Sequence, residues 1–126
     1  RVFDEINESV AMSAMYAANH VSNVTAIVCL TESGITPLLT SRLSSILPIF
    51  GISPHLATCR RMALYRGVIP IYYDVMADEG DLWTKAMALI VERGALQPGE
   101  RVAITAGDLH GKGGSTNTLK ILQYNT

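Results

Sequence analysis

A chain of 126 residues, 48% of them hydrophobic and 17% charged, is long enough for one domain with a single core and too apolar for a disordered segment. Its formal net charge of −1 provides no electrostatic basis for binding nucleic acid or an anionic membrane surface. The sequence shows no signal peptide and no apolar run near the roughly 18–20 residues of a membrane span, so we expect neither secretion nor a membrane-spanning helix.

The first third of the chain predicts a helix, a buried strand and a second helix. Apolar residues recur at helical spacing over residues 6–19, and the alanines among them indicate close packing against a flat surface such as a sheet. The run 25–30 is continuously apolar and β-branched, which is typical of a strand covered on both faces. After a turn at residues 31–36, a second helical pattern covers residues 37–46, with Thr36 as its expected N-cap and a proline at its first position.

The remaining helices carry recognisable end signals. Ser53-Pro54 is the expected cap of a helix over residues 56–64, on which Arg60 and Arg61 are expected to lie on a solvated or partner-facing side. A further helix begins at Leu82, and we expect it to be capped by the preceding aspartate and closed by a C′ glycine.

Strands and helices alternate until two strands, joined by a glycine-rich loop, end the chain. This order predicts a three-layer α/β/α fold with a mostly parallel five-stranded sheet and an antiparallel last strand at or near an edge. Pro70 lacks an N–H and disfavours a central position for its strand. The expected strands after the first are 48–52, 68–73, 102–105 and 119–124.

The glycine-rich loop spans residues 107–117 and has the composition of a phosphate-binding loop. Its four glycines let the backbone approach a ligand closely, Lys112 adds a positive charge, and Ser115 and Thr116 add hydroxyl groups. A flexible surface connection is an equal alternative on composition alone. The loop is not a Walker A motif, because three residues rather than four separate Gly107 from Gly111 and a strand rather than a helix follows.

The turn at residues 31–36 is a second candidate anion site. It offers hydroxyl groups and free amides at the start of a helix, where negative charge is favoured. Plain helix capping accounts for Thr36 and the proline after it, but not for Thr31 and Ser33. If the strands before the two loops are parallel, both loops lie at the edge where open α/β sheets bind ligands, and one site made from two loops is predicted.

Several segments in one order resemble the C-terminal domain of pyruvate kinase, and the similarity spans nearly the whole chain. The segments are Glu8-Ser-Val-Ala-Met-Ser-Ala, Leu30-Thr-Glu-Ser-Gly34, Pro48-Ile-Phe, Ala63-Leu-Tyr-Arg-Gly-Val68, Pro70 and Gly114-Ser-Thr-Asn-Thr118. The resemblance implies one domain over residues 1–126 and a regulatory role in a cytoplasmic homotetramer. In that family a separate β/α barrel, which binds Mg²⁺ and K⁺, transfers a phosphoryl group from phosphoenolpyruvate to ADP. No part of this chain matches the barrel, so the chain is expected to be a fragment with no catalytic residue, metal site or cofactor of its own.

The resemblance also assigns the effector site residue by residue. Thr31, Glu32, Ser33, Gly34, Ile35 and Thr36 correspond to the family's effector phosphate-binding loop, and Gly113, Gly114, Ser115 and Thr116, with Lys112 as an addition, fall in the loop that closes over the effector.

Two departures from the family pattern narrow the effector class. Members activated by fructose 1,6-bisphosphate often carry lysine where this chain has Glu32, and a basic residue near the position of Leu82. The second phosphate seat is therefore expected to be lost, and a sugar monophosphate or AMP is favoured. The alternatives are a stand-alone phosphometabolite-binding protein and a purely structural oligomerisation module.

The two cysteines and the first residue give expectations about the compartment and about the length of the whole protein. Cys29 lies in an apolar run and Cys59 in a helical pattern, and together they form no metal or redox motif. Two buried free thiols in a reducing, cytoplasmic compartment are the simplest interpretation. The chain begins at Arg1 without a methionine, which also suggests a piece of a longer protein.

Overall fold

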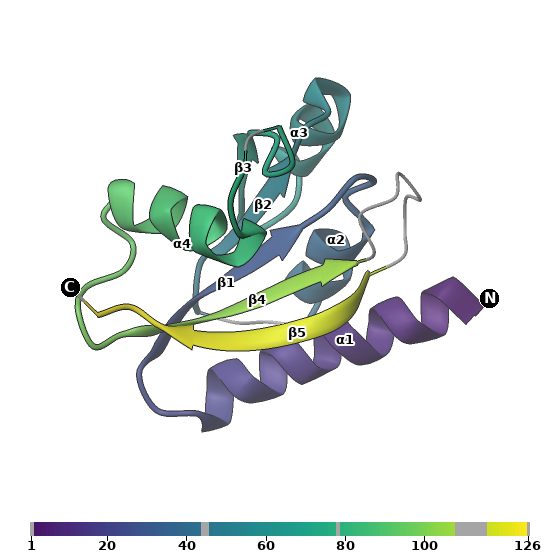
Figure 1. Ribbon diagram of the computed structural model, residues 1–126. Coiled ribbons are helices and arrows are strands. Elements are labelled where there is room, and N and C mark those ends of the chain that lie inside the picture. The colour runs from purple at the N-terminus through teal and green to yellow at the C-terminus, as the bar shows by residue number, and fades with distance from the viewer. Residues whose placement is uncertain (1, 44–45, 78, 108–115, 126) are drawn as a thin grey trace.

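The computed structural model describes residues 2–43, 46–77, 79–107 and 116–125, with side chains from residue 5 onward. Four helices and five strands occupy these residues (Figure 1). In chain order they are α1 Val2–His20, β1 Val24–Leu30, α2 Ile35–Ser41, β2 Ile49–Ser53, α3 Leu56–Met62, β3 Val68–Tyr72, α4 Leu82–Glu92, β4 Arg101–Gly107 and β5 Thr116–Gln123.

The five strands form one sheet in the order β3-β2-β1-β4-β5. Strands β3, β2, β1 and β4 run parallel to their neighbours, whereas β5 returns antiparallel to β4 at the edge. Strand β3 forms the other edge of the sheet. Pro70 lies in this strand and is paired with Gly51 of β2. The predicted fold class and the edge position of Pro70 are therefore confirmed.

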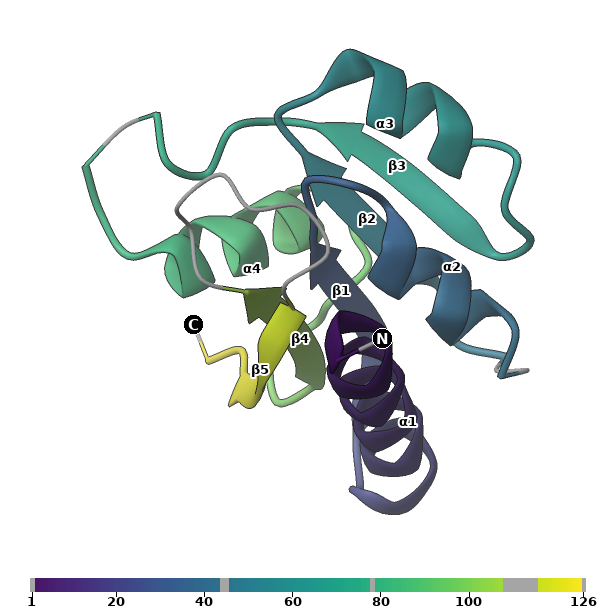
Figure 2. The same cartoon turned by 90° about the vertical axis from the view of Figure 1, so that its right-hand side faces the viewer.

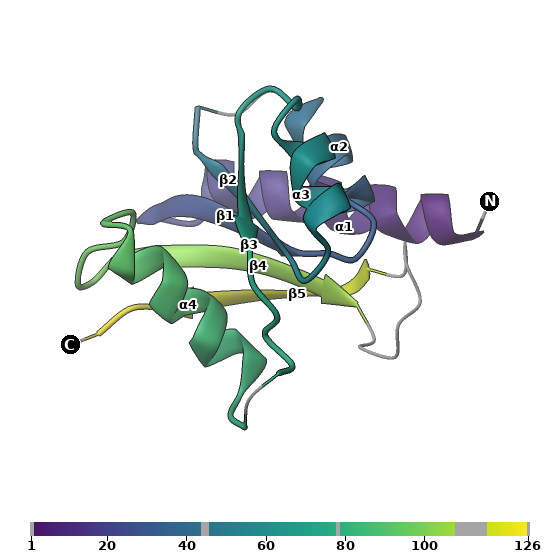
Figure 3. The same ribbon diagram turned by 90° about the horizontal axis from the view of Figure 1, so that it is seen from above.

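Helices cover both faces of the sheet, but unequally (Figures 2 and 3). Successive strand residues point to opposite faces, so Ala26, Val28 and Leu30 of β1 pack on the side of α4, while Ile27 and Cys29 pack on the side of α1 and α3. Viewed from above, α4 lies alone on one side of the sheet and α1, α2 and α3 share the other. Helix α4 contributes Ala86 and Ile90, both fully buried, to its half of the core.

Small residues allow the helices to approach the sheet closely. Ala11, Ala14 and Ala17 of α1 are buried, as the alanine pattern predicts. On the same side of the sheet, a Cβ added to Gly51 of β2 would overlap the sulfur of Met62 in α3. A side chain at position 51 would therefore require the Met62 side chain to shift.

The ends of α4 agree with the sequence and those of α2 and α3 do not. Asp81 accepts a hydrogen bond from the backbone N–H of Thr84, and Gly94 follows the helix at a φ of 76°. Helix α3 ends at Met62, two residues early, and its N-cap is His55, whose N–H donates to the Ser53 hydroxyl. Helix α2 begins at Ile35 and not after Thr36, for a reason given below.

Both cysteines are free and buried. Burial in the apolar core raises the pKa of the Cys29 thiol to about 11, so the thiolate is strongly disfavoured at neutral pH. No helix in the described part of the chain is both long and apolar enough to cross a membrane.

Candidate functional site

The predicted meeting of two loops at one sheet edge follows from the strand directions. Because β1 and β4 are parallel and in register at Cys29 and Thr105, their carboxyl ends lie side by side. The loop 31–36 leaves β1 there, β4 ends at Gly107, and β5 begins beside it at Thr116. The other predicted members of the second loop, Lys112, Gly113, Gly114 and Ser115, lie outside the described residues.

The hydroxyl groups of the first loop organise its own turn. Thr31 Oγ1 accepts a hydrogen bond of 2.8 Å from the N–H of Gly34, and Ser33 Oγ accepts one of 3.3 Å from the N–H of Ile35. Gly34 is the N-cap of α2 and takes a φ of 84°, a left-handed conformation that favours glycine. These short-range bonds close the turn two residues before the position that the sequence indicated.

Thr36 is not the N-cap of α2, which corrects the sequence prediction. Because Thr31 and Ser33 already cap the turn, Thr36 lies inside the first turn of the helix and its hydroxyl is available for another partner. Thr36 Oγ1 donates a hydrogen bond of 2.6 Å to Thr116 Oγ1 at the start of β5. The two candidate loops are thus joined by a direct side-chain contact.

A third element joins this contact. The N–H of Thr116 donates a bond of 3.1 Å to Oδ1 of Asn7 in α1, and the side chains of Asn7, Thr36 and Thr116 are 0%, 1% and 5% exposed. Buried polar groups are costly unless they are paired, so these bonds define the positions of three elements relative to one another. We call Asn7, Thr36 and Thr116 the buried junction.

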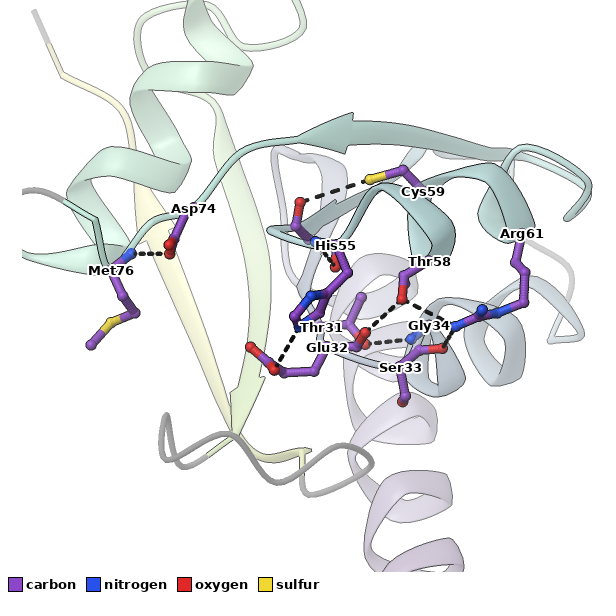
Figure 4. A network of polar contacts seen from close by, with 11 residues as sticks. Thr31, Glu32, Ser33, Gly34, His55, Thr58, Cys59, Arg61, Asp74 and Met76 are labelled. Atoms are coloured by element: carbon purple, nitrogen blue, oxygen red, sulfur yellow. Dashed lines mark hydrogen bonds and ion pairs between the residues drawn. The ribbon is translucent and has the colours of Figure 1, made fainter.

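Helix α3 also binds the first loop, through side chains that reach its backbone (Figure 4). Thr58 Oγ1 donates a 2.7 Å bond to the carbonyl oxygen of Glu32, and Arg61 Nη2 donates to the carbonyl oxygen of Ser33 at 3.2 Å and to Thr58 Oγ1 at 3.0 Å. Arg61 is exposed, as the sequence indicates, but it is turned toward the loop. No local pattern signals this contact, because Arg61 and Ser33 are 28 residues apart.

The acidic residue of the loop has a partner. Glu32 Oε1 lies 2.9 Å from His55 Nε2, and both side chains remain partly exposed. Leu82, the other position that departs from the family pattern, begins α4 and packs against the apolar core. A basic group is therefore present at neither position, and Glu32 interacts with the side chain of the N-cap residue of α3.

The described residues contain no group of three or more His, Cys, Asp and Glu side chains arranged to hold a metal ion. The chemistry that the site offers is hydrogen bonding from hydroxyl groups and backbone amides, with Arg61 and His55 at its border with α3. These groups suit the oxygens of a small anion.

A mainly parallel α/β/α domain with a hydroxyl-rich loop at the carboxyl edge of its sheet defines the class of this protein. A family model described as "Pyruvate kinase, alpha/beta domain" matches residues 8–122. The chain belongs to this family, which confirms the resemblance to the C-terminal domain of pyruvate kinase.

Relatives with curated descriptions support the same family membership. The chain is 51% identical over 121 residues to "Pyruvate kinase" of Buchnera aphidicola subsp. Baizongia pistaciae (96% of this chain, 25% of the relative). It is 51% identical over 120 residues to "Pyruvate kinase II" of Salmonella typhimurium (95% and 25%), and 47% identical over 121 residues to "Pyruvate kinase" of Haemophilus influenzae (95% and 25%). The chain therefore spans about a quarter of the length of these relatives.

Proposed function

We propose that this chain is the regulatory domain of a pyruvate kinase and binds a phosphorylated allosteric effector between the loop 31–36 and the segment 112–116. The complete protein would transfer a phosphoryl group from phosphoenolpyruvate to ADP in a separate catalytic barrel that uses Mg²⁺ and K⁺, and this chain would contribute no catalytic residue. The family membership of residues 8–122 supports this assignment. The two buried free thiols suit a reducing compartment, so we place the protein in the cytoplasm.

The observation that carries the proposal is the contact between Thr36 and Thr116. It joins the loop after β1 to the strand that leaves the glycine-rich segment, at the edge where open α/β sheets bind ligands. A phosphate at this edge would meet hydroxyl groups and amides from both segments. Oxygen acceptors on the ligand match these donors.

The effector class follows from the charges around the loop. The carboxylate of Glu32 would repel a second phosphate, and Leu82 supplies no cation at the start of α4. A single phosphate is compatible with the remaining donors. We therefore propose a monophosphate, such as glucose 6-phosphate or AMP, in preference to a bisphosphate.

The same domain is proposed to take part in assembly of a homotetramer and to contact its own catalytic barrel. Helix α1 exposes the apolar side chains of Met12 and Tyr16, which are 61% and 65% accessible and one helical turn apart. Exposed apolar side chains at this spacing support an interface with another protein surface.

Calorimetric titration of the purified protein with glucose 6-phosphate, AMP and fructose 1,6-bisphosphate at fixed ionic strength tests the proposal. We expect saturable binding of a monophosphate, lost in the Thr31→Ala/Ser33→Ala/Thr36→Ala variant. Because Thr31 and Thr36 make buried hydrogen bonds, the single Ser33→Ala variant, with its thermal melt, is the cleaner probe of the ligand contact.

The outcomes separate the candidate functions. Tighter binding of the bisphosphate would show that Glu32 and Leu82 do not exclude a second phosphate. Unchanged affinity in the triple variant would overturn the site assignment. Absence of binding by all three ligands would favour a purely structural module, while binding without any catalytic barrel in the intact protein would favour a stand-alone phosphometabolite-binding protein.

A further inference from the structure

We propose that Arg61 of α3 is a positioning residue for the loop 31–36, which we call the effector loop, and that it acts on affinity through the loop backbone without touching the effector. The inference rests on the proposed function of the loop and adds to it a residue outside the two binding segments. Its basis is two hydrogen bonds from α3 to the backbone of Glu32 and Ser33, and a third within α3 that joins Arg61 to Thr58 (Figure 4).

One nitrogen of Arg61 connects these bonds. Nη2 donates both to the carbonyl oxygen of Ser33 and to Oγ1 of Thr58, and Thr58 Oγ1 in turn donates to the carbonyl oxygen of Glu32. Thr58 is 3% exposed, so its hydroxyl depends on these partners for its hydrogen bonds. Two consecutive carbonyl groups of the loop are therefore held by side chains one helical turn apart on α3.

Holding these carbonyls determines where the loop amides point. A trans peptide unit is planar and its N–H points opposite to its C=O, and the described residues contain no cis peptide bond. The N–H of Ser33 is therefore directed away from Thr58, and the N–H of Gly34 away from Arg61, toward Thr31 Oγ1. Arg61 and Thr58 thus orient two consecutive amides of the proposed effector-binding loop, and the Gly34 amide closes the turn on Thr31 Oγ1.

The carboxylate of Glu32, the negative charge in the loop, has a partner other than Arg61. The carboxylate of Glu32 is 2.9 Å from His55, whereas the guanidinium of Arg61 is engaged with Ser33 and Thr58. Its Nη2 donates to the carbonyl oxygen of Ser33 in the loop and to Thr58 Oγ1, which supports the loop. This geometry assigns Arg61 to orientation of the loop and not to direct capture of phosphate.

The test uses Arg61→Ala and Arg61→Lys, with Arg60→Ala as the matched control, since Arg60 is the exposed arginine next to Arg61 on α3. Two quantities are measured: hydrogen exchange of the Gly34 amide in the free protein and the Kd of glucose 6-phosphate by calorimetry at several salt concentrations. The Gly34 amide belongs to the peptide unit whose carbonyl Arg61 holds, so it reports on the clamp before any ligand is added.

We expect Arg61→Ala to accelerate exchange of the Gly34 amide and to weaken effector binding about five- to tenfold, the scale of one typical net hydrogen bond. The salt dependence of Kd should stay that of the wild type, because Arg61 does not contact the phosphate. Arg61→Lys retains an ammonium donor and should be intermediate in both measurements. Arg60→Ala should match the wild type, and the thermal midpoints of all variants should agree within a few degrees.

Three results would overturn the inference. Wild-type affinity in Arg61→Ala would show that the loop is positioned without α3, and a lower salt dependence in that variant would show direct contact with the phosphate. Absence of effector binding by the wild-type protein would overturn the proposed function and the inference together. A failure of the inference alone is recognised because the wild type and Arg60→Ala then still bind.

Discussion

Thr36 and Thr116 are 80 residues apart in the chain, yet their hydroxyl oxygens lie 2.6 Å apart in a buried environment. The contact links α2 to β5, and Asn7 extends it to α1. The buried junction thus connects the candidate effector loop to the strand that leaves the glycine-rich segment and to the first helix. Any movement of one of these elements must break or shift a buried hydrogen bond.

The hydroxyl–hydroxyl contact can be measured by a double-mutant cycle. Thr36→Val and Thr116→Val each keep the β-branched shape and leave one buried hydroxyl without its partner, which should lower the free energy of unfolding by about 1–3 kcal/mol. In the double variant the second loss should be smaller, with a coupling energy of about 0.5–1.5 kcal/mol in urea unfolding. Strictly additive losses would show that the two hydroxyl groups do not interact in solution.

Asn7 should be among the least replaceable polar residues of α1. Asn7→Ala removes the acceptor for the buried N–H of Thr116 and leaves a cavity, so we expect a loss of about 2–4 kcal/mol in the free energy of unfolding. Glu8→Ala, an exposed change on the same helix, is the control and should stay within about 0.5 kcal/mol of the wild type. Equal urea midpoints for the two variants would contradict the junction.

Gly34 can be tested against a second glycine that has the same left-handed backbone conformation. Gly34 and Gly67 have φ values of 84° and 75°, and a methyl group at Gly67 would meet no atom within 4 Å. Both Gly→Ala changes should cost about 1–2 kcal/mol of stability because an L side chain is strained there. Only Gly34→Ala should also weaken effector binding in calorimetry. An equal effect of Gly67→Ala on Kd would show that binding does not depend on the conformation of the loop 31–36.

A side chain at position 51 would have to displace Met62 from the contact between β2 and α3. Gly51→Ala should destabilise the protein by about 1–3 kcal/mol, since the new methyl group would overlap the sulfur of Met62. Met62 also lies 3.4 Å from the position of a Cβ on Gly34, so displacement of Met62 should raise the mobility of the effector loop. Hydrogen exchange at Gly34 checks this, and unchanged exchange would mean that Met62 adjusts without reaching the loop.

The Cys29 thiol predicts a pH dependence of stability with a definite sign. Burial raises its pKa from 9.0 to about 11 in the folded protein, so the folded state binds the proton more tightly than the unfolded state. The resulting contribution of the Cys29 thiol to the free energy of unfolding is complete below pH 9 and is lost as pH rises toward 11. Its magnitude is roughly 2–3 kcal/mol. Urea unfolding at pH 8 and 10.5 should show a steeper decline for the wild type than for Cys29→Ala; parallel declines would contradict the burial effect.

Most of the fold could be predicted because its determinants are local. The apolar run of β1 indicates a strand covered on both faces, Pro70 indicates an edge, and Asp81 with Gly94 mark the ends of a helix. Each of these signals depends on residues within a few positions of one another. Strand direction then follows from the order of the elements.

The site was less predictable because its hydrogen bonds join residues that are far apart in the sequence. The pattern Thr36-Pro37 satisfies the usual rule for an N-cap, but Thr31 and Ser33 meet the same demand earlier and leave Thr36 for a distant partner. The role of Arg61 also depends on a residue of another element. The assignments of Lys112, Gly113, Gly114 and Ser115 stay predictions.

The two edge strands of the sheet carry residues that hinder pairing with strands of other molecules. The proline of β3 has no N–H to donate to an incoming strand, and on the other edge β5 presents Lys120, whose ammonium lies 4.6 Å from the centre of the Trp83 ring. Prolines and lysines on outer strands discourage the pairing that begins aggregation. The sheet is therefore poorly suited to recruit a sixth strand from a neighbouring molecule.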